Sequence, residues 1–215
     1  MDSIDRVWLI NKPLNWTSFD VVNKLRFRLK MKKIGHAGTL DPLATGLLIV
    51  CTGKMCKQID TFMGLEKEYT GTFTLGQTTA SYDLETEPSP PQSVIHLTTA
   101  SIVQATQSFI GEIQQIPPAH SAIRINGTRA YKLARKGKEA ALPPRNVSIR
   151  SFDITHVSLP QVHFRVSCSK GTYIRSLAHD FGQSLGVGAY LSALCRTRIG
   201  TYRLEDALTV DQVEP

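Results

Sequence analysis

Little in this sequence fits a membrane, disulfide-bonded or secreted protein. No apolar run approaches the roughly 18 residues that a membrane-spanning helix needs. The N-terminus, MDSIDRVWLINKP, has no basic region followed by a hydrophobic stretch, so we expect no secretory signal. The four cysteines form neither a CxxC motif nor a Cys/His zinc spacing (Cys51, Cys56, Cys168 and Cys195). We therefore expect reduced thiols, a cytoplasmic location and no contact with membranes.

The motifs of nucleotide-, metal- and serine-dependent enzymes are missing as well. Gly46 lies seven positions before Gly53, where a phosphate-binding loop needs five, and Met55 stands where Ser or Thr would hold magnesium. The patterns GxGxxG, HExxH and GxSxG do not occur. The six histidines are scattered without metal-ligand spacing. We expect chemistry performed by side chains alone, with no cofactor and no metal.

What the chain does contain is positive charge, gathered in blocks. The formal net charge is +7, and residues 24–33, KLRFRLKMKK, hold six basic residues and no acid. Residues 119–150 carry a net charge of +7, whereas residues 66–118 carry −5. Clustered cations with aromatic residues nearby, such as Phe27 and Tyr131, are typical of a face that binds a polyanion. A nucleic-acid partner is the favoured interpretation, and a solvated basic surface that binds nothing is the alternative.

Composition and periodicity favour a globular α+β fold. With 215 residues, of which 41% are hydrophobic, the chain suits one large domain or two small ones. A helix should begin at Thr17 or Ser18, with an apolar face made of Phe19, Val22, Leu25 and Leu29. The other predicted helices are 54–63, 98–109 and 172–185, and the predicted strands are 47–51, 69–75, 122–125, 147–154, 162–168 and 196–203. Because helices and strands do not alternate regularly, we expect a largely antiparallel sheet.

One carboxylate, Asp41, lies in a turn rich in glycine, within KIGHAGTLDPLATG (33–46). His36 lies five residues upstream, Pro42 follows directly, and an apolar strand begins at Leu47. An acid on a bent loop beside a core strand is a common setting for catalysis. An Asp next to Gly and Pro also often satisfies only its own backbone, so the local pattern leaves both interpretations open.

Longer segments of the chain narrow the choice. They are LINKPLNWTSFDVVNKLR (9–26), KIGHAGTLDPLATGLLIVCTGK (33–54), KEYTGTFTLGQTTASYDLE (67–85), RINGTRAYKLARKGKE (124–139) and SCSKGTYIRSLAHDFG (167–182). In this order they resemble the tRNA pseudouridine synthases of the TruB family, and they cover nearly the whole chain. The resemblance implies the pseudouridine synthase fold, a mixed, mostly antiparallel sheet flanked by helices and loops. It also implies isomerisation of the T-loop uridine at position 55 of tRNA.

The resemblance assigns catalytic roles to three residues. Asp41 matches the family's nucleophile, and Arg175 matches the arginine that pairs with it. A flipped base excludes water from the pocket, and this desolvation disfavours the ionised form of a carboxylate. A permanently charged guanidinium nearby offsets the cost of desolvation. Tyr69 matches the tyrosine that stacks on the extruded base and is proposed to assist proton transfer. The alternatives are that Tyr69 only packs in the core and that Arg175 is an exposed helix residue.

Further residues are expected to bind the RNA. Those implied for the substrate pocket are His36, Lys67, Leu194, Tyr173 and Lys12. His36 would fill the space left by the flipped nucleotide, Leu194 would form an apolar wall, and Lys12 with Pro13 would support the site from below. Where the family often has Gly, this chain has Asn15, which tolerates a left-handed turn. The residues expected to contact the RNA backbone are Arg124, Arg129, Lys132 and Arg135.

The resemblance also predicts the domain organisation and the partner. We expect a pseudouridine synthase catalytic domain over residues 1–200, with an RNA-binding insertion at about 120–145. A short C-terminal tail, 201–215, should follow, without the PUA domain that many bacterial members carry. The expected partner is the T-arm of tRNA, bound by a monomer. An RNA-binding or RNA-chaperone module without catalysis, and a synthase that is guided by a separate RNA or acts on ribosomal RNA, are the alternatives.

Overall fold

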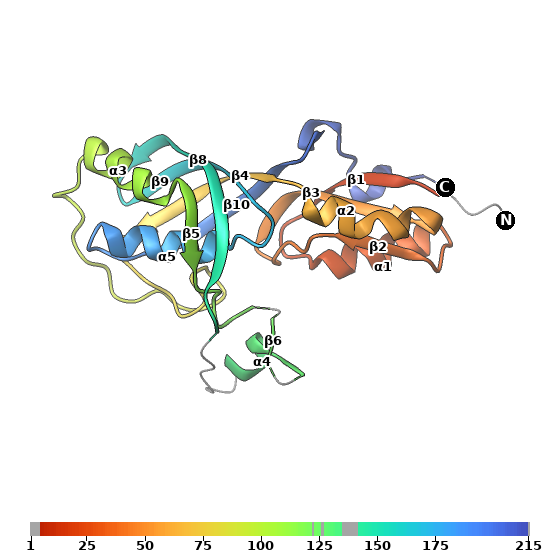
Figure 1. The fold of residues 1–215 in the computed structure, drawn as a ribbon, viewed down its shortest axis with the longest axis horizontal. Coiled ribbons are helices and arrows are strands. Elements are labelled where there is room, and N and C mark those ends of the chain that lie inside the picture. The colour runs from red at the N-terminus through yellow and green to blue at the C-terminus, as the bar shows by residue number, and fades with distance from the viewer. Residues whose placement is uncertain (1–4, 122, 126, 135–141, 215) are drawn as a thin grey trace. The chain divides into compact units, whose positions relative to one another are not determined.

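The chain forms two compact units, each built from segments that are separate in the sequence (Figure 1). The computed structural model describes residues 5–121, 123–125, 127–134 and 142–214. Unit 1 comprises Met1–Thr70, Ser167–Lys170 and Ala193–Pro215. Unit 2 comprises Gly71–Val166 and Gly171–Ser192. Among the described residues, no helix is both long and apolar enough to cross a membrane.

Unit 1 is organised around a buried strand. Its strands are β1 (Val7–Lys12), β2 (Ile34–Ala37), β3 (Ala44–Thr52) and β11 (Tyr202–Arg203), with parts of β4 (Lys67–Leu75) and β10 (Ala189–Ile199). β1 and β2 both pair antiparallel with β3, and β10 pairs parallel with it, placing Leu194 opposite Ala44. β3 is buried over almost its whole length. A continuous apolar run of this kind is typical of a strand covered on both faces.

The first helix, α1 (Ser18–Arg28), begins at a complete capping box. The Thr17 side chain accepts a hydrogen bond from the Asp20 backbone, and the Asp20 carboxylate accepts one from the Thr17 backbone, at 3.0 and 2.8 Å. Such a cap stabilises a helix by about 1 kcal/mol. The predicted start of α1 is confirmed, but Phe19 on its apolar face is wrong, since it is 57% exposed. Val22, Leu25 and Leu29 are buried as predicted, and Val21 is buried beside them.

The C-terminal segment packs into the core of unit 1. Leu208 forms a parallel bridge with Ile10 of β1 and donates its backbone N–H to Leu9 at 2.9 Å. Val210 and Val213 are buried among residues of β1 and α1. Short 3₁₀ turns, Leu204–Asp206 and Val210–Gln212, shape this segment. Residues 201–214 therefore contribute to the fold, and the division at residue 200 stays a prediction.

Unit 2 is built from further strands and helices. Its elements are β5 (Gly111–Gln115), β6 (Arg124–Ile125), β7 (Thr128–Arg129), β8 (Arg145–Ser158), most of β9 (Gln161–Cys168), α3 (Thr99–Thr106), α4 (Ala130–Ala134) and α5 (Ile174–Ser184), with the remaining parts of β4 and β10. Figure 1 shows α5 lying against the strands of this unit, and Phe181 supplies the contact. It packs on Phe73 of β4 and Phe152 of β8. Phe73 also stacks on Phe164 of β9, with ring centroids 4.1 Å apart.

The strands pair in the order β1-β3-β10-β4-β9-β8-β5, with β2 attached to β3 and β11 to β10. The predicted α+β class with a mixed, mostly antiparallel sheet is confirmed. Several boundaries were wrong. The strand predicted to start at residue 196 begins at Ala189, and the helix predicted over 54–63 is a 3₁₀ turn, Gly53–Gln58, followed by α2 (Ile59–Gly64). β1, β2 and β5 were not predicted.

Candidate active site

The turn that carries Asp41 is held in place on both sides. Ser18, in the first turn of α1, accepts a hydrogen bond from the backbone N–H of Leu40 at 2.8 Å. The carbonyl of Pro42 accepts one from the N–H of Asn15 at 2.8 Å, and Asn15 has the expected left-handed φ of 64°. The Asp41 carbonyl accepts from Ala44, which closes the turn into β3. Asp41 itself is half-buried, and the hydrogen bonds on both sides fix the backbone of its turn.

Lys12 lies directly beneath this turn. Its side chain is fully buried, and the ammonium donates hydrogen bonds to the carbonyls of Pro13, Trp16 and Pro42 at 2.9, 2.6 and 3.4 Å. Burial lowers the pKa of Lys12 from 10.5 to about 8, and the negative charge of Asp41 acts in the opposite direction. At neutral pH the group therefore remains an ammonium ion. This geometry fits the supporting role, and a contact between Lys12 and the substrate stays a prediction.

A second buried cation, Arg196, was not among the predicted site residues. Its Nε donates to the carbonyl of Leu47 at 2.8 Å, and its Nη2 donates to Gly38 at 3.0 Å. Leu47 lies on β3, which follows Asp41, and Gly38 lies in the turn that precedes it. Arg196 lies two positions after the predicted Leu194, in LSALCRTRIG (191–200), and this closeness in sequence was the available signal. The structure shows that its side chain is buried.

Tyr69 and Lys67, both on β4, lie in the field of this arginine. Tyr69 is 9% exposed. Burial raises the pKa of its phenol, and the charge of Arg196 acts against that shift. The ammonium of Lys67 donates to the carbonyls of Met63 and Leu65, at 2.6 and 2.5 Å. Burial, followed by the charge of Arg196, lowers the pKa of Lys67 to about 8. Tyr69 is a neutral phenol at pH 7, able to stack or to donate a proton.

His36 and Leu194 complete the predicted residues of unit 1. His36 is half-buried on β2, opposite Val50 of β3. Its Nδ1 is buried, and no hydrogen-bond partner for it occurs among the described residues. Burial and the charge of Arg196 both lower the pKa of His36, which favours a neutral imidazole. Leu194 is half-buried on β10, and its carbonyl accepts a hydrogen bond from the Thr45 hydroxyl at 3.3 Å.

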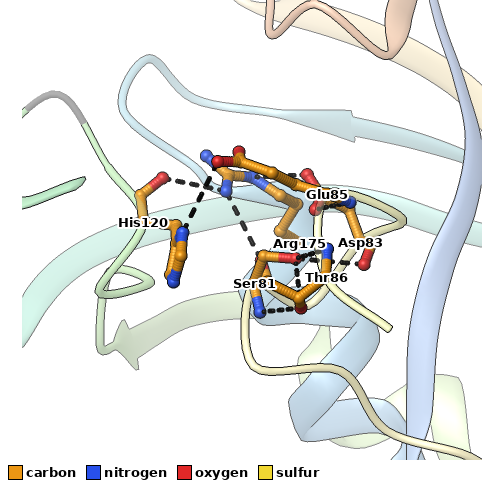
Figure 2. Close-up of polar contacts among 6 residues, drawn as sticks. All are labelled: Ser81, Asp83, Glu85, Thr86, His120 and Arg175. Carbon is orange, nitrogen blue, oxygen red and sulfur yellow. Dashed lines mark hydrogen bonds and ion pairs between the residues drawn. The ribbon is translucent and has the colours of Figure 1, made fainter. Parts of the chain in front are cut away.

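Arg175 lies in unit 2, in the first turn of α5, and is 4% exposed. The alternative of an exposed helix residue is therefore wrong. Its Nε is 3.6 Å from Oδ2 of Asp83, which is itself buried. Its Nη1 donates to the carbonyls of His120 and Ser81, at 3.0 and 3.4 Å. Figure 2 shows the guanidinium between these three residues, with His120 approaching from a different segment. Asp83 is a partner that no local pattern in the sequence indicated.

The loop that presents Asp83 is closed by its own hydrogen bonds. Oδ1 of Asp83 accepts from the backbone of Glu85 at 2.9 Å. The Ser81 hydroxyl lies 2.9 Å from that of Thr86 and donates to the Asp83 carbonyl at 3.1 Å. Glu85 also lies 3.6 Å from Nδ1 of His120. These contacts, drawn in Figure 2, fix one face of the Arg175 guanidinium.

The remaining predicted residues lie on unit 2. Tyr173 precedes α5, and its backbone exchanges two hydrogen bonds with the Gln115 side chain, at 2.8 and 3.0 Å. The guanidinium of Arg145 lies 4.6 Å above its ring. The cations expected to bind the RNA backbone belong to the segment around β6 and α4. Arg124 and Arg129 face each other in the β6–β7 pair and Lys132 lies on α4, but their side chains, and the whole of Arg135, lie outside the described residues.

The structure thus brings Asp41, Tyr69, Lys12 and Lys67 together with Arg196 in unit 1, where His36 and Leu194 also lie. Arg175 and Tyr173 belong to unit 2. The pairing of Asp41 with Arg175 stays a prediction. Within the described part of the chain, no group of three or more His, Cys, Asp or Glu side chains is arranged to hold a metal ion.

The chain matches known proteins in sequence over nearly its whole length. The chain is 50% identical over 216 residues to the tRNA pseudouridine synthase B of Flavobacterium johnsoniae, covering 97% of this chain and 94% of the relative. It is 51% identical over 208 residues to the protein of the same name from Bacteroides fragilis, covering 94% and 89%. The solved structure of a Cbf5-Nop10-Gar1 complex matches with a TM-score of 0.75 and 30% identity, over 95% of this chain.

The chain spans about half the length of that solved protein, 53%. The same is true of the protein in an H/ACA RNP bound to a substrate RNA containing 2'-deoxyuridine, with a TM-score of 0.71 and 51% of its length covered. Residues 26–174 match the model of the TruB family pseudouridylate synthase N-terminal domain. Residues 175–215 match that of the tRNA pseudouridylate synthase B C-terminal domain. The chain therefore belongs to the TruB family of pseudouridylate synthases.

Proposed function

We propose that this protein converts the T-loop uridine at position 55 of tRNA to pseudouridine. Relatives about 50% identical to it carry the name tRNA pseudouridine synthase B, and the chain covers about nine-tenths of their length. The reaction breaks the bond between uracil N1 and ribose C1′, rotates the base and joins C5 to C1′. C5 loses its proton and N1 gains one, so the product is an isomer of uridine and no group is added. Side chains alone can supply this chemistry.

Asp41 is the proposed nucleophile. A uridine stacked inside the T-loop has to leave its stack before a carboxylate can reach it, and unstacking costs a few kcal/mol. Tyr69 lies in the same unit, and a base that stacks on an aromatic ring regains about 1–3 kcal/mol. His36, neutral and half-buried, is suited to occupy the space the nucleotide leaves. Arg175 would pair with Asp41 in the complex with RNA.

The observation that carries the proposal is the electrostatic setting of Asp41. The negative charge of Asp41 acts to raise the pKa of Lys12, and the positive charge of Arg196 acts to lower it. The same two charges act in the same directions on the pKa of Tyr69. Two buried cations therefore act on the space in which Asp41 lies. Opposite charges nearby favour an ionised carboxylate, which is the form a nucleophile requires.

The basic blocks supply a surface for the T-arm. Residues 119–150 carry a net charge of +7, and contacts from Lys and Arg to phosphates position an RNA without reading its sequence. Recognition of RNA usually depends on loop shape and on splayed bases. We expect one protein molecule, acting as a monomer in the cytoplasm, to bind one T-arm.

The guided alternative has less support. The solved structures whose titles name Nop10, Gar1 or an H/ACA RNP contain chains about twice as long as this one, at 29 or 30% identity. The relatives named for tRNA are closer to it in both sequence and length. A chaperone role without catalysis would not require Asp41, since a carboxylate beside a phosphate backbone weakens binding by repulsion.

The decisive assay measures tritium released from tRNA labelled at uracil C5. The wild-type protein should release one label per T-loop, and Asp41→Asn should release none while still binding tRNA. Asp60→Asn, which changes an exposed acid on α2, should release label at the wild-type rate. Unchanged release from Asp41→Asn would refute the assigned nucleophile. Release from a tRNA with cytidine at position 55 would refute the assigned position.

A further inference from the structure

A tyrosine in the Asp83 loop has a backbone conformation that tyrosine rarely adopts. Tyr82 has a φ of +64°, in the left-handed region that favours glycine. Its N–H donates to the carbonyl of Thr79 at 3.2 Å, and its own carbonyl accepts from Leu191 at 2.9 Å. A bulky residue persists in this region only when its surroundings hold it there, and such residues cluster at functional sites.

The neighbours of Tyr82 on both sides contact the same guanidinium. The carbonyl of Ser81 accepts from Arg175 at 3.4 Å, and the carboxylate of Asp83 lies 3.6 Å from Nε of Arg175. The backbone dihedrals of residue 82 set the direction of residue 81 relative to residue 83. The left-handed turn at Tyr82 therefore decides whether both groups can reach Arg175 together. Figure 2 shows Ser81 and Asp83 beside the guanidinium.

The ring of Tyr82 anchors this loop to the helix that carries Arg175. It stacks on His179 with centroids 4.1 Å apart and an interplanar angle of 17°. His179 follows Arg175 by four residues on α5, and residues at this spacing lie on the same face of a helix, one turn apart. Glycine would adopt the same φ without strain but would contribute no ring. The presence of a tyrosine indicates that the ring has a role.

We propose that Tyr82 is a positioning residue for Arg175. By stacking on His179, it holds Ser81 and Asp83 against the guanidinium and so fixes the direction in which Arg175 points. The proposal rests on the function proposed above, in which Arg175 acts on Asp41. A misplacement of about 1 Å at a catalytic group costs up to about a hundredfold in rate. Loss of the stack should therefore lower kcat rather than the affinity for tRNA.

The test compares Tyr82→Gly with Tyr82→Phe. Phe keeps the stack and the strain, and it should keep kcat within about twofold of the wild type. Gly relieves the strain, should not lower the melting temperature, and should reduce kcat about tenfold or more with KM for tRNA unchanged. A Gly variant with wild-type kcat overturns the proposal. Substitutions of His179 on α5 test the same stack from its other side. His179→Phe keeps an aromatic ring and should retain kcat, whereas His179→Ala should lower it.

A second readout does not depend on catalysis. The Nε–H proton of Arg175 should give a protected, assignable ¹H–¹⁵N NMR signal in the wild type and in Tyr82→Phe, identified by its loss in Arg175→Lys. In Tyr82→Gly it should broaden or exchange faster. If the wild type released no tritium yet this signal behaved as expected, the proposed function would fail and the positioning role would stand. A signal unchanged in Tyr82→Gly overturns the positioning role.

Discussion

Replacing Lys12 by Met removes the buried ammonium beneath the Asp41 turn while keeping most of the side-chain volume. Three backbone carbonyls, those of Pro13, Trp16 and Pro42, lose a donor. Pro42 still accepts from the N–H of Asn15 at 2.8 Å. The carbonyls of Pro13 and Trp16 lose the Lys12 hydrogen bond, and their unpaired acceptors account for most of the loss in stability. We therefore expect the variant to be less stable and its Asp41 turn to be less ordered.

The magnitude follows from these contacts. A buried acceptor that loses its partner costs about 1–3 kcal/mol, so two of them cost about 2–6 kcal/mol. Removing a buried charge offsets part of this, because the charge is itself unfavourable in the core. We expect a net loss of about 2 kcal/mol in the free energy of unfolding. For a chain of 215 residues this lowers Tm by about 4–8 °C.

Thermal and urea unfolding, followed by circular dichroism, measure this change. Lys57→Met is the matched control, because Lys57 is exposed on the 3₁₀ turn before α2 and its loss should change stability by less than about 0.5 kcal/mol. Equal Tm values for Lys12→Met and the wild type would refute the reasoning. So would equal losses in the Lys12 and Lys57 variants.

The difference in unfolding free energy between the wild type and Lys12→Met should change with pH. The pKa of Lys12 is about 8 in the folded chain, below its ordinary value of 10.5, so between these pH values the unfolded chain binds more protons. Stability contributed by this group therefore rises with pH across that window. The difference in unfolding free energy between wild type and Lys12→Met should grow from neutral pH towards pH 10.5. A constant or shrinking difference would contradict the assigned pKa direction.

Three further predictions concern other parts of the fold. Gly46→Ala should lower the free energy of unfolding in urea by about 2–4 kcal/mol, since φ is +101° and a Cβ would lie 2.7 Å from the backbone nitrogen of Arg196. The control is Gly64→Ala, which should cause no loss because a Cβ there meets nothing within 4 Å. Asp83→Asn should cost about 3 kcal/mol and reduce kcat, because it removes a buried negative charge that lies 3.6 Å from the buried guanidinium of Arg175. The matched change at the surface pair of Arg28 with Asp211, Asp211→Asn, should cost less than about 1 kcal/mol, and comparable losses would contradict the buried role. Affinity for tRNA, measured by filter binding, should fall steeply as salt rises, since phosphate contacts release counterions; a flat response would contradict RNA binding by the basic blocks.

Local chemistry made some features of this fold predictable from the sequence. Thr17 and Asp20 lie three residues apart and cap α1, and the turn at Asn15 requires only a residue that tolerates positive φ. Periodicity was less reliable on the surface of α1, where Phe19 continued the apolar pattern but faces solvent. A sequence window cannot tell which apolar residue next to a helix start meets the core, because the neighbouring strands decide it.

The candidate site depended on contacts between distant residues, which no window contains. Arg196 reaches a carbonyl 149 positions away in the sequence, at Leu47. Asp83 and Arg175 belong to segments separated by most of unit 2. The resemblance to a family identified Asp41, Tyr69 and Arg175 as candidates, but their surroundings became visible only in three dimensions. The roles of these residues stay predictions until the variants are measured.

The way in which unit 1 holds its buried cations bears on the chemistry of Asp41. Lys12, Lys67 and Arg196 all donate to backbone carbonyls, whose dipoles satisfy the N–H groups but carry no net charge. A carboxylate in the same positions would cancel each positive charge. Carbonyl partners leave the charge in place, and in a core of low effective dielectric constant it acts over several ångströms. The fold thereby keeps a positive potential around a half-buried acid, and the same potential attracts the phosphates of an RNA brought to it.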